Sequence, residues 1–118
     1  MNNIGGFMEN DLLQKIIKIL DDKKAIDIKY MEIKDVTTIA DYFVITNGTS
    51  NTHIKALADN VEYELKKDGI YPNKIEGYDS GTWILMDYGD VIIHIFTESE
   101  RENYKIEELW QEMKQKLD

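Results

Sequence analysis

The sequence predicts a single α/β domain, with one mixed β-sheet covered by helices in the order αββαβββα. Apolar residues recur at helical spacing in three segments, and runs rich in β-branched and aromatic residues lie between them. The densest run, residues 80–99, has Gly89-Asp90 between two apolar stretches, which is typical of a β-hairpin. The 118 residues, 42% of them hydrophobic and without an internal repeat, predict one core over residues 1–118, with residues 1–9 as a flexible extension.

The composition narrows the possible functions. The chain has no cysteine, which excludes a disulfide framework and cysteine-based metal or thiol chemistry. No apolar run approaches a membrane span and no leader pattern is present, so we expect a cytoplasmic protein without a membrane partner. Its 23 acidic and 14 basic residues give a net charge of −9, which repels phosphate backbones. We therefore expect no direct nucleic-acid binding, and a basic protein as partner if the chain works near nucleic acid.

The first helix is predicted over residues 10–20, with Asn10 or Asp11 as its cap. Leu12 and Ile19 widen its apolar face, which favours a helix packed in the core over one that binds a partner. The helical spacing itself is carried by Leu13, Ile16, Ile17 and Leu20.

Two strands are predicted next, at residues 25–34 and 42–46. In the first, the alternation of apolar residues changes phase after Tyr30, which indicates a bulge or bend. The second is continuously apolar, as in a central strand covered on both faces. A turn at Gly48-Thr49-Ser50 then leads into a helix that ends near Lys66-Lys67 and Gly69, and we expect a βαβ unit with parallel strands. Its buried face is predicted to consist of Ile54, Leu57, Ala58, Val61 and Leu65.

Residues 74–76 are predicted to form a short edge strand, and the last helix follows the hairpin. Ser99-Glu100-Arg101-Glu102 has the form of a capping box that would start this helix. Its apolar stripe is predicted to be buried, so that Trp110 serves the fold. The stripe consists of Ile106, Leu109, Trp110, Met113 and Leu117.

The Gly89-Asp90 turn predicts the register of the hairpin and so divides its side chains between two faces. The core face pairs Tyr88 with Val91, Met86 with Ile93, Ile84 with Ile95 and Thr82 with Thr97. The outer face pairs Asp87 with Ile92, Leu85 with His94 and Trp83 with Phe96. Either the last helix covers this outer face, or it remains exposed and marks a protein interface. For His94, one interpretation is a structural histidine that pairs with Asp87 across the ribbon.

The signals for catalysis are weak. The turn at Gly48-Thr49-Ser50, before a helix, could offer backbone N–H groups to a phosphate, although helix capping by Ser50 or Asn51 also explains it. Nucleotidyl transfer needs paired carboxylates for Mg²⁺, and the sequence has no Asp-x-Asp pair. The two histidines, His53 and His94, lack further ligands nearby in the sequence. We expect no metal, no cofactor and no catalytic residue.

Several motifs between Leu12 and Trp110 resemble the Iojap family of ribosomal silencing factors. Ile106 stands where that family usually has leucine. The motifs are Ala40-Asp41-Tyr42-Phe43-Val44-Ile45, Gly48-Thr49-Ser50, His53, Glu76-Gly77, Gly81-Thr82-Trp83, Asp87-Tyr88-Gly89-Asp90-Val91-Ile92-Ile93-His94, Arg101-Glu102-Asn103-Tyr104 and Glu107-Glu108-Leu109-Trp110.

The resemblance implies a nucleotidyltransferase-like fold without the catalytic carboxylates. It also implies a translational repressor that binds a protein of the large ribosomal subunit, the fourteenth in the usual naming, at the intersubunit face. This binding would block joining of the small subunit when nutrients are limited, without a cofactor. Homodimers occur in some family members. The alternative hypothesis is a nucleotide-binding or nucleotidyltransferase-like enzyme that uses the Gly48 turn.

The outer face of the hairpin is our candidate site for the partner protein. Asp87, together with the acidic edge at Glu98 and Glu100, is expected to complement basic side chains. The predicted interface consists of Trp83, Leu85, Asp87, Tyr88, Ile92, His94 and Phe96.

Overall fold

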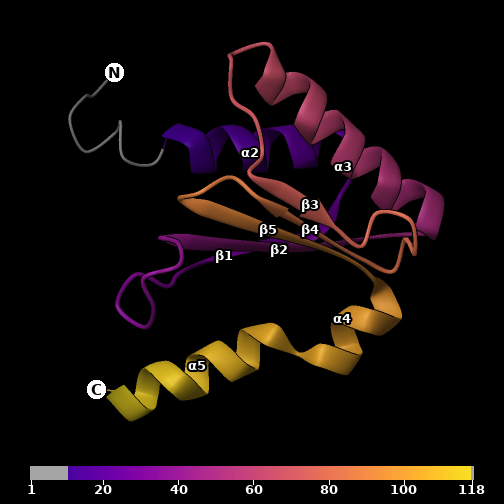
Figure 1. Ribbon diagram of the computed structural model, residues 1–118. Helices are drawn as coiled ribbons and strands as arrows, with labels where there is room; N and C mark the ends of the chain where they lie inside the picture. The colour runs from indigo at the N-terminus through magenta and orange to yellow at the C-terminus, as the bar shows by residue number, and fades with distance from the viewer. Residues whose placement is uncertain (1–10, 118) are drawn as a thin grey trace.

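The computed structural model describes residues 11–117, which form a five-stranded mixed sheet with helices on both faces (Figure 1). This architecture confirms the predicted fold class. The expected extension over residues 1–9 and the proposed Asn10 cap lie outside the described residues. In chain order the elements are α2 (Asp11–Asp22), β1 (Ile26–Glu32), β2 (Tyr42–Gly48), α3 (Asn51–Lys66), β3 (Lys74–Glu76), β4 (Trp83–Asp87), β5 (Val91–Thr97), α4 (Glu98–Tyr104) and α5 (Ile106–Leu117).

The strands lie in the order β1-β2-β5-β4-β3, so β2 and β5 are central and β3 is an edge strand, as predicted. Among the strand pairs of residues 11–117, only β2–β5 is parallel. The strand that directly follows α3, β3, runs in the same direction as β2 but lies at the far edge of the sheet. The two strands that flank α3, β2 and β3, are therefore parallel as expected, but they are not neighbours, because β5 and β4 lie between them. This placement is the one expected from burial. Because β5 is apolar on both faces, it belongs at the centre of the sheet, where helices cover both faces.

The upper face of the sheet, as drawn in Figure 1, packs against α2 and α3. All five apolar residues predicted for the buried face of α3 are buried. In α2, Leu12 and Ile17 pack against the core and Ile19 is buried within it, which confirms the core interpretation of the wide apolar face. The strands contribute Val44, Ile84, Met86, Val91, Ile93 and Ile95 to this upper core, and the hairpin turn adds Tyr88.

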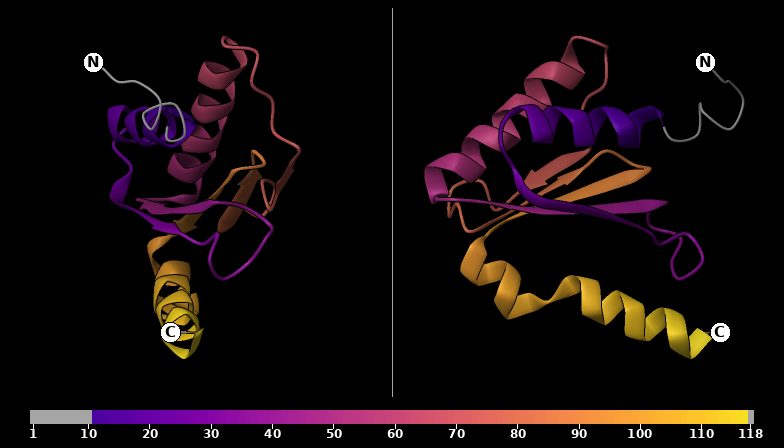
Figure 2. Two further views of the ribbon diagram at one scale, coloured as in Figure 1. Left: turned by 90° about the vertical axis from the view of Figure 1, so that its left-hand side faces the viewer. Right: turned by 180° about the vertical axis from the view of Figure 1, so that it is seen from behind.

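The lower face packs against α4 and α5, which form one narrow layer in both views of Figure 2. Here the ring of Trp110 meets the ring of Phe43 edge-on, with their centroids 5.2 Å apart. The buried members of this lower core are Ile33, Ala40, Phe43, Ile45, Ile92 and Phe96, with Met31, Trp83, Leu85, Ile106 and Trp110 packed against them.

The C-terminal helical segment differs from the prediction, since it is two helices rather than one. Lys105 has a left-handed conformation with φ of 48°, which ends α4 and turns the chain into α5. The predicted capping box is wrong, because α4 begins at Glu98 and Ser99 already lies inside it. The strand pairing explains this early start, since β5 stays paired with β2 up to Thr97.

The break at Lys105 also changes which residues of α5 face the sheet. Ile106 and Trp110 pack against the lower core, whereas Leu109 is 53% exposed and Met113 41% exposed. The predicted buried stripe is therefore wrong for these two residues. The side chain of its last member, Leu117, lies outside the described part of the structure. The predicted stripe was based on one continuous helix. Because the chain turns at Lys105, α5 presents other residues to the sheet than a continuous helix would.

The strands contain the expected irregularities, but not all at the expected place. The register of β1 against β2 shifts between Ile26 and Lys29, where Asp27 has a φ of 48°, so the bulge lies before Lys29 and not after Tyr30, where the apolar pattern changes phase. At the hairpin turn, Gly89 has the expected positive φ, 86°, and the N–H of Tyr88 donates to the carbonyl oxygen of Val91 at 2.9 Å.

The loop before β4 depends on a glycine at position 77. Gly77 has a φ of 79°, and a Cβ atom at this position would lie 2.0 Å from the carbonyl oxygen of Trp83. The same loop is tied to α3, because the Asn51 side-chain amide donates to the carbonyl oxygen of Gly81 at 2.7 Å. The loop before β4 is therefore tied to α3 at Gly81. It also packs so closely against Trp83 that residue 77 has no room for a side chain.

We expect Gly77→Ala to lower the free energy of unfolding by about 2 kcal/mol more than Gly69→Ala does. Both glycines have a positive φ, so both substitutions strain the backbone, but a Cβ at Gly69 has no atom within 4 Å. Chemical denaturation of the two variants measures the difference. Equal losses of stability would show that the contact with Trp83 relaxes without cost.

Candidate protein-binding face

The observed register of the hairpin is the predicted one. β4 and β5 pair Trp83 with Phe96, Leu85 with His94 and Asp87 with Ile92. Phe96 and Ile92 belong to the lower core, so these three pairs point towards the side of the sheet that α4 and α5 occupy. The face that the sequence analysis selected as a candidate interface is therefore the lower face of the sheet.

The two strands of the hairpin differ in how far this face is covered. On β5, Ile92, His94 and Phe96 are buried, and His94 is 4% exposed. On β4, Trp83, Leu85 and Asp87 are all half-buried. The covering interpretation therefore holds for the β5 side chains.

The position of α5 explains this difference. Its Trp110 lies on Phe43 of β2, and its residues Glu107 and Gln111 line a groove with β1, so α5 runs beneath the β1–β2 side of the sheet. Tyr88, the seventh predicted residue, is buried in the upper core instead, because it follows the alternation of Ile84 and Met86. Contact of these residues with a partner protein stays a prediction.

The half-buried residues of β4 form one surface with a residue that the sequence analysis did not select. Tyr104, the last residue of α4, is 47% exposed, and its ring lies 4.7 Å from the ring of Trp83. Trp83 also stacks on Phe96 at 5.1 Å. We name the surface formed by Trp83, Leu85, Asp87 and Tyr104 the open patch. Tyr104 comes to this place because α4 follows directly on β5, and it does not belong to the predicted apolar stripe, so helical periodicity gave no signal for it.

Polar contacts hold the ring of Trp83 in one orientation. Its Nε1–H donates to Nδ1 of His94 at 3.1 Å, so Nδ1 is the accepting nitrogen of the imidazole. The predicted pairing of His94 with Asp87 is wrong, because the Asp87 carboxylate accepts from the backbone N–H of Gly89 at 2.8 Å. An aromatic side chain that is fixed before binding loses little conformational freedom when it meets a partner.

His94 is a buried and neutral histidine. Its Nε2 has no hydrogen-bond partner among the described residues, and burial lowers the pKa of His94 from 6.5 to about 4. The ring lies between Phe43, at 4.6 Å between centroids, and the neighbouring aromatic rings of β4 and β5. A proton on this ring would place a charge inside the lower core.

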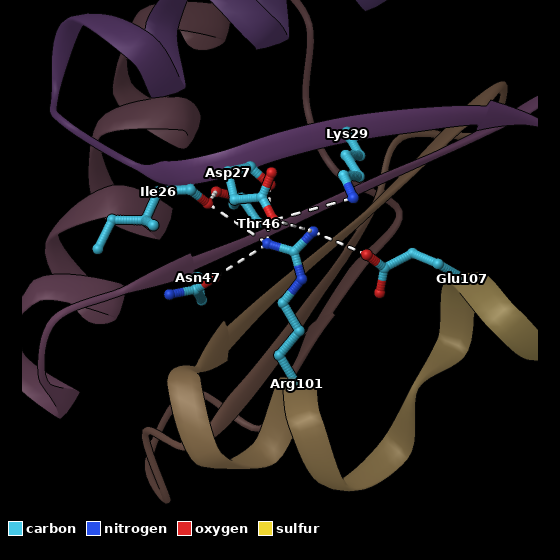
Figure 3. Close-up of polar contacts among 7 residues, drawn as sticks. All are labelled: Ile26, Asp27, Lys29, Thr46, Asn47, Arg101 and Glu107. Carbon is cyan, nitrogen blue, oxygen red and sulfur yellow. Dashed lines mark hydrogen bonds and ion pairs between the residues drawn. The ribbon is translucent and has the colours of Figure 1, made fainter.

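Arg101 attaches the C-terminal helices to the sheet (Figure 3). Its guanidinium donates to the backbone carbonyl of Asp27 at 2.7 Å and to the Asn47 side chain at 2.9 Å, at the bulge of β1 and the end of β2. A second nitrogen donates to Glu107 of α5 at 2.8 Å. This single side chain therefore connects β1, β2, α4 and α5, and it determines where the cover of the lower face lies.

The turn at Gly48-Thr49-Ser50 is occupied by the protein itself. The hydroxyl of Ser50 accepts from the N–H of His53 at 3.0 Å, and the N–H of Thr49 donates to Nδ1 of His53 at 2.9 Å. A Cβ at Gly48 would lie 2.9 Å from the same ring nitrogen. The helix-capping interpretation is thus confirmed, since the groups that could hold a phosphate bind His53 and the helix start.

No group of three or more acidic, histidine or cysteine side chains suited to a metal ion occurs within residues 11–117. In the same part of the chain, no helix has both the length and the apolar character needed to cross a bilayer.

Comparison with known proteins decides the family. Residues 8–118 match the family model described as ribosomal silencing factor during starvation. The chain belongs to the ribosomal silencing factor family. It is 37% identical over 100 residues to ribosomal silencing factor RsfS of Halalkalibacterium halodurans, an alignment that covers 85% of this chain and 86% of the relative.

Two further relatives extend this comparison. Over 112 residues, the chain is 33% identical to the Mus musculus protein named mitochondrial assembly of ribosomal large subunit protein 1, covering 92% of this chain and 48% of that protein. A crystal structure of a Chromobacterium violaceum protein has a TM-score of 0.84 to this fold at 34% identity, covering 86% of this chain and 85% of that chain. Membership of the ribosomal silencing factor family supports a ribosome-associated role in silencing translation.

We expect the stability of the protein to fall by about 2 kcal/mol between pH 7 and pH 5 because of His94. The unfolded chain binds this proton near pH 6.5, whereas the folded protein binds it only near pH 4. The unfolded state therefore takes up more protons in this window, and lowering the pH favours unfolding. Denaturation of the parent and of His94→Gln across this range measures the effect.

In His94→Gln this pH dependence should be largely lost. If the variant kept the pH dependence of the parent, another group would be responsible.

Proposed function

We propose that this protein represses translation by binding a basic protein of the large ribosomal subunit, the fourteenth in the usual naming, at the face where the small subunit joins. The bound protein would then sterically block joining of the small subunit when nutrients are limited. The family description, ribosomal silencing factor during starvation, supports the silencing role. The mouse relative carries the large ribosomal subunit in its name, which supports that subunit as the place of binding.

The observation that carries the choice of surface is the open patch. It combines the half-buried Trp83 and Leu85 of β4 with the exposed Tyr104 of α4, and tryptophan and tyrosine are enriched at the centres of protein interfaces. Beneath them lie the buried Ile92, His94 and Phe96, which support the patch from the neighbouring strand. In this proposal, the β4 side chains of the predicted interface make the contact, and the β5 side chains hold them in position.

The charge of the protein favours a basic partner. The net charge is −9, and Asp87 is a half-buried carboxylate at the end of the patch opposite Tyr104. Long-range attraction to a basic protein speeds association more than it tightens the complex. Salt should therefore weaken binding modestly, because an apolar contact supplies most of the affinity.

The alternative, an enzyme that acts on nucleotides at the Gly48 turn, has less support. Thr49 and Ser50 are bonded to His53, and the described residues contain no cluster of carboxylates for Mg²⁺. We propose that the fold is used for binding rather than for catalysis.

We expect Trp83→Ala to weaken binding to the isolated ribosomal protein by about 30-fold or more, since a desolvated tryptophan in an interface commonly contributes about 2 kcal/mol. Asp87→Lys should also weaken it, through charge repulsion. Calorimetry gives the affinities, and sedimentation of mixed ribosomal subunits shows whether the same variants fail to prevent joining.

The matched control is Tyr63→Ala, which removes an exposed aromatic residue of α3 on the opposite side of the sheet. It should bind as the parent does. Melting curves must show that all three variants fold, because Trp83 also contacts His94. If folded Trp83→Ala and Asp87→Lys retained full affinity, the open patch would not be the binding surface.

We also expect no turnover of nucleoside triphosphates with Mg²⁺ by the purified protein, since Thr49 and Ser50 are bonded to His53 and the described residues contain no cluster of carboxylates for the metal. Incubation with radiolabelled triphosphates tests this. Nucleotidyl transfer that disappears in Ser50→Ala would establish the enzymatic alternative instead.

A further inference from the structure

A groove runs between the edge strand β1 and the C-terminal helix α5, away from the open patch. It has a volume of about 620 Å³. Its walls come from β1 and the loop after it on one side and from α5 on the other. The residues that line it are Ile28, Lys29, Tyr30, Met31, Glu32, Ile33, Val36, Glu107, Trp110 and Gln111.

One wall of this groove is a strand edge. Within residues 11–117, β1 is the outermost strand of the sheet and pairs with β2 alone. Every residue from Ile28 to Ile33 lines the groove, so the groove follows the backbone of β1 and not one face of it. An exposed strand edge offers a ladder of backbone donors and acceptors to an extended peptide.

One end of the groove is apolar. Met31 and Ile33 lie on the lower face of β1, since they belong with the lower core, and Val36 and Trp110 complete this end. The ring of Trp110 meets Phe43 edge-on, and this half-buried side chain also lines the groove. An apolar side chain of an added strand would find its contact area here.

The other end is acidic. A second hollow of about 420 Å³ shares Lys29, Glu107 and Gln111 with the groove and continues it towards Ile26. Five carboxylates line this hollow against three basic side chains, and one of these, Arg101, is already bonded to Glu107 and to β1. The carboxylates are Asp27, Glu98, Glu102, Glu107 and Glu108.

We propose that this groove binds a basic, extended segment of another protein as an additional strand on β1. Alternate side chains of a strand point to the same face. The segment would therefore place an apolar residue beside Trp110 and Met31, and lysine or arginine residues two and four positions away near Glu102 and Glu108. Charge complementarity argues against a second copy of this chain, whose net charge is −9.

This surface is separate from the open patch. The patch lies on the β4 side of the lower face, whereas the groove lies at the opposite edge of the sheet, because β1 and β3 are the two ends of the strand order. The proposal goes beyond the proposed function, and either one can fail without the other.

The test is a nuclear magnetic resonance titration of the full chain with a synthetic peptide, acetyl-Thr-Phe-Thr-Lys-Thr-Lys-Thr-amide. The same peptide in reverse order covers both strand directions. We expect one of the two to give saturable shifts of the backbone amides from Ile28 to Ile33 and slower hydrogen exchange at β1. A peptide with glutamate in place of both lysines should bind more weakly.

Two charge-reversal variants of α5 sharpen this experiment. Glu108→Lys, in the acidic hollow, should weaken peptide binding roughly five-fold, as expected for a partly screened ion pair. Glu112→Lys makes the same change of charge on an exposed residue of the same helix that lines neither hollow, and should leave the affinity within about two-fold of the parent.

Three results would overturn the proposal. They are the absence of saturable shifts in β1 with either peptide at millimolar concentration, equal binding of the glutamate peptide, and equal effects of the two variants. Concentration-dependent dimerisation of the free chain with exchange protection at β1 would also overturn it, because the edge would then belong to a second copy.

Discussion

The structure depends on burying both faces of β5 at once. Its side chains alternate between Val91, Ile93 and Ile95 on the upper face and Ile92, His94 and Phe96 on the lower face, and all six are buried. A strand of this kind must be central and must have a cover on each side. The parallel partner β2, the helices α2 and α3 above, and the returning helices α4 and α5 below all meet this requirement.

The two covers are unequal, and this inequality is the basis of the proposed binding surface. The upper cover has two amphipathic helices with extensive buried faces. The lower cover is one narrow layer, interrupted at Lys105 and attached through Arg101 to the β1 bulge. Because that attachment draws α5 towards β1 and β2, the β4 side of the lower face remains partly uncovered. The open patch thus lies on the side of the lower face away from the contacts of Arg101 with β1 and β2.

The turn before α3 has the shape of a phosphate-binding turn, but polar groups of the turn bind His53 of the same chain. A strand, a glycine and a helix start are all present, and in other proteins such a turn holds phosphate. In this chain the imidazole of His53 takes the N–H of Thr49 and also lies 3.1 Å from the carbonyl oxygen of Lys23, which follows α2. The turn is therefore an internal contact between the start of α3 and the segment that follows α2.

Local patterns of the sequence determined the strands, the buried face of α3, the register of the hairpin and the division of its side chains between two faces. Each of these follows from residues close together in the chain, such as Gly89 at the turn. The break at Lys105, the exposure of Leu109, the cover over Phe96 and the partner of His94 were decided only by the tertiary structure. Arg101 and Asp27 are separated by 74 positions in the chain. Such a bond forms only once the sheet has brought its two ends together, so no periodicity in the sequence can reveal it.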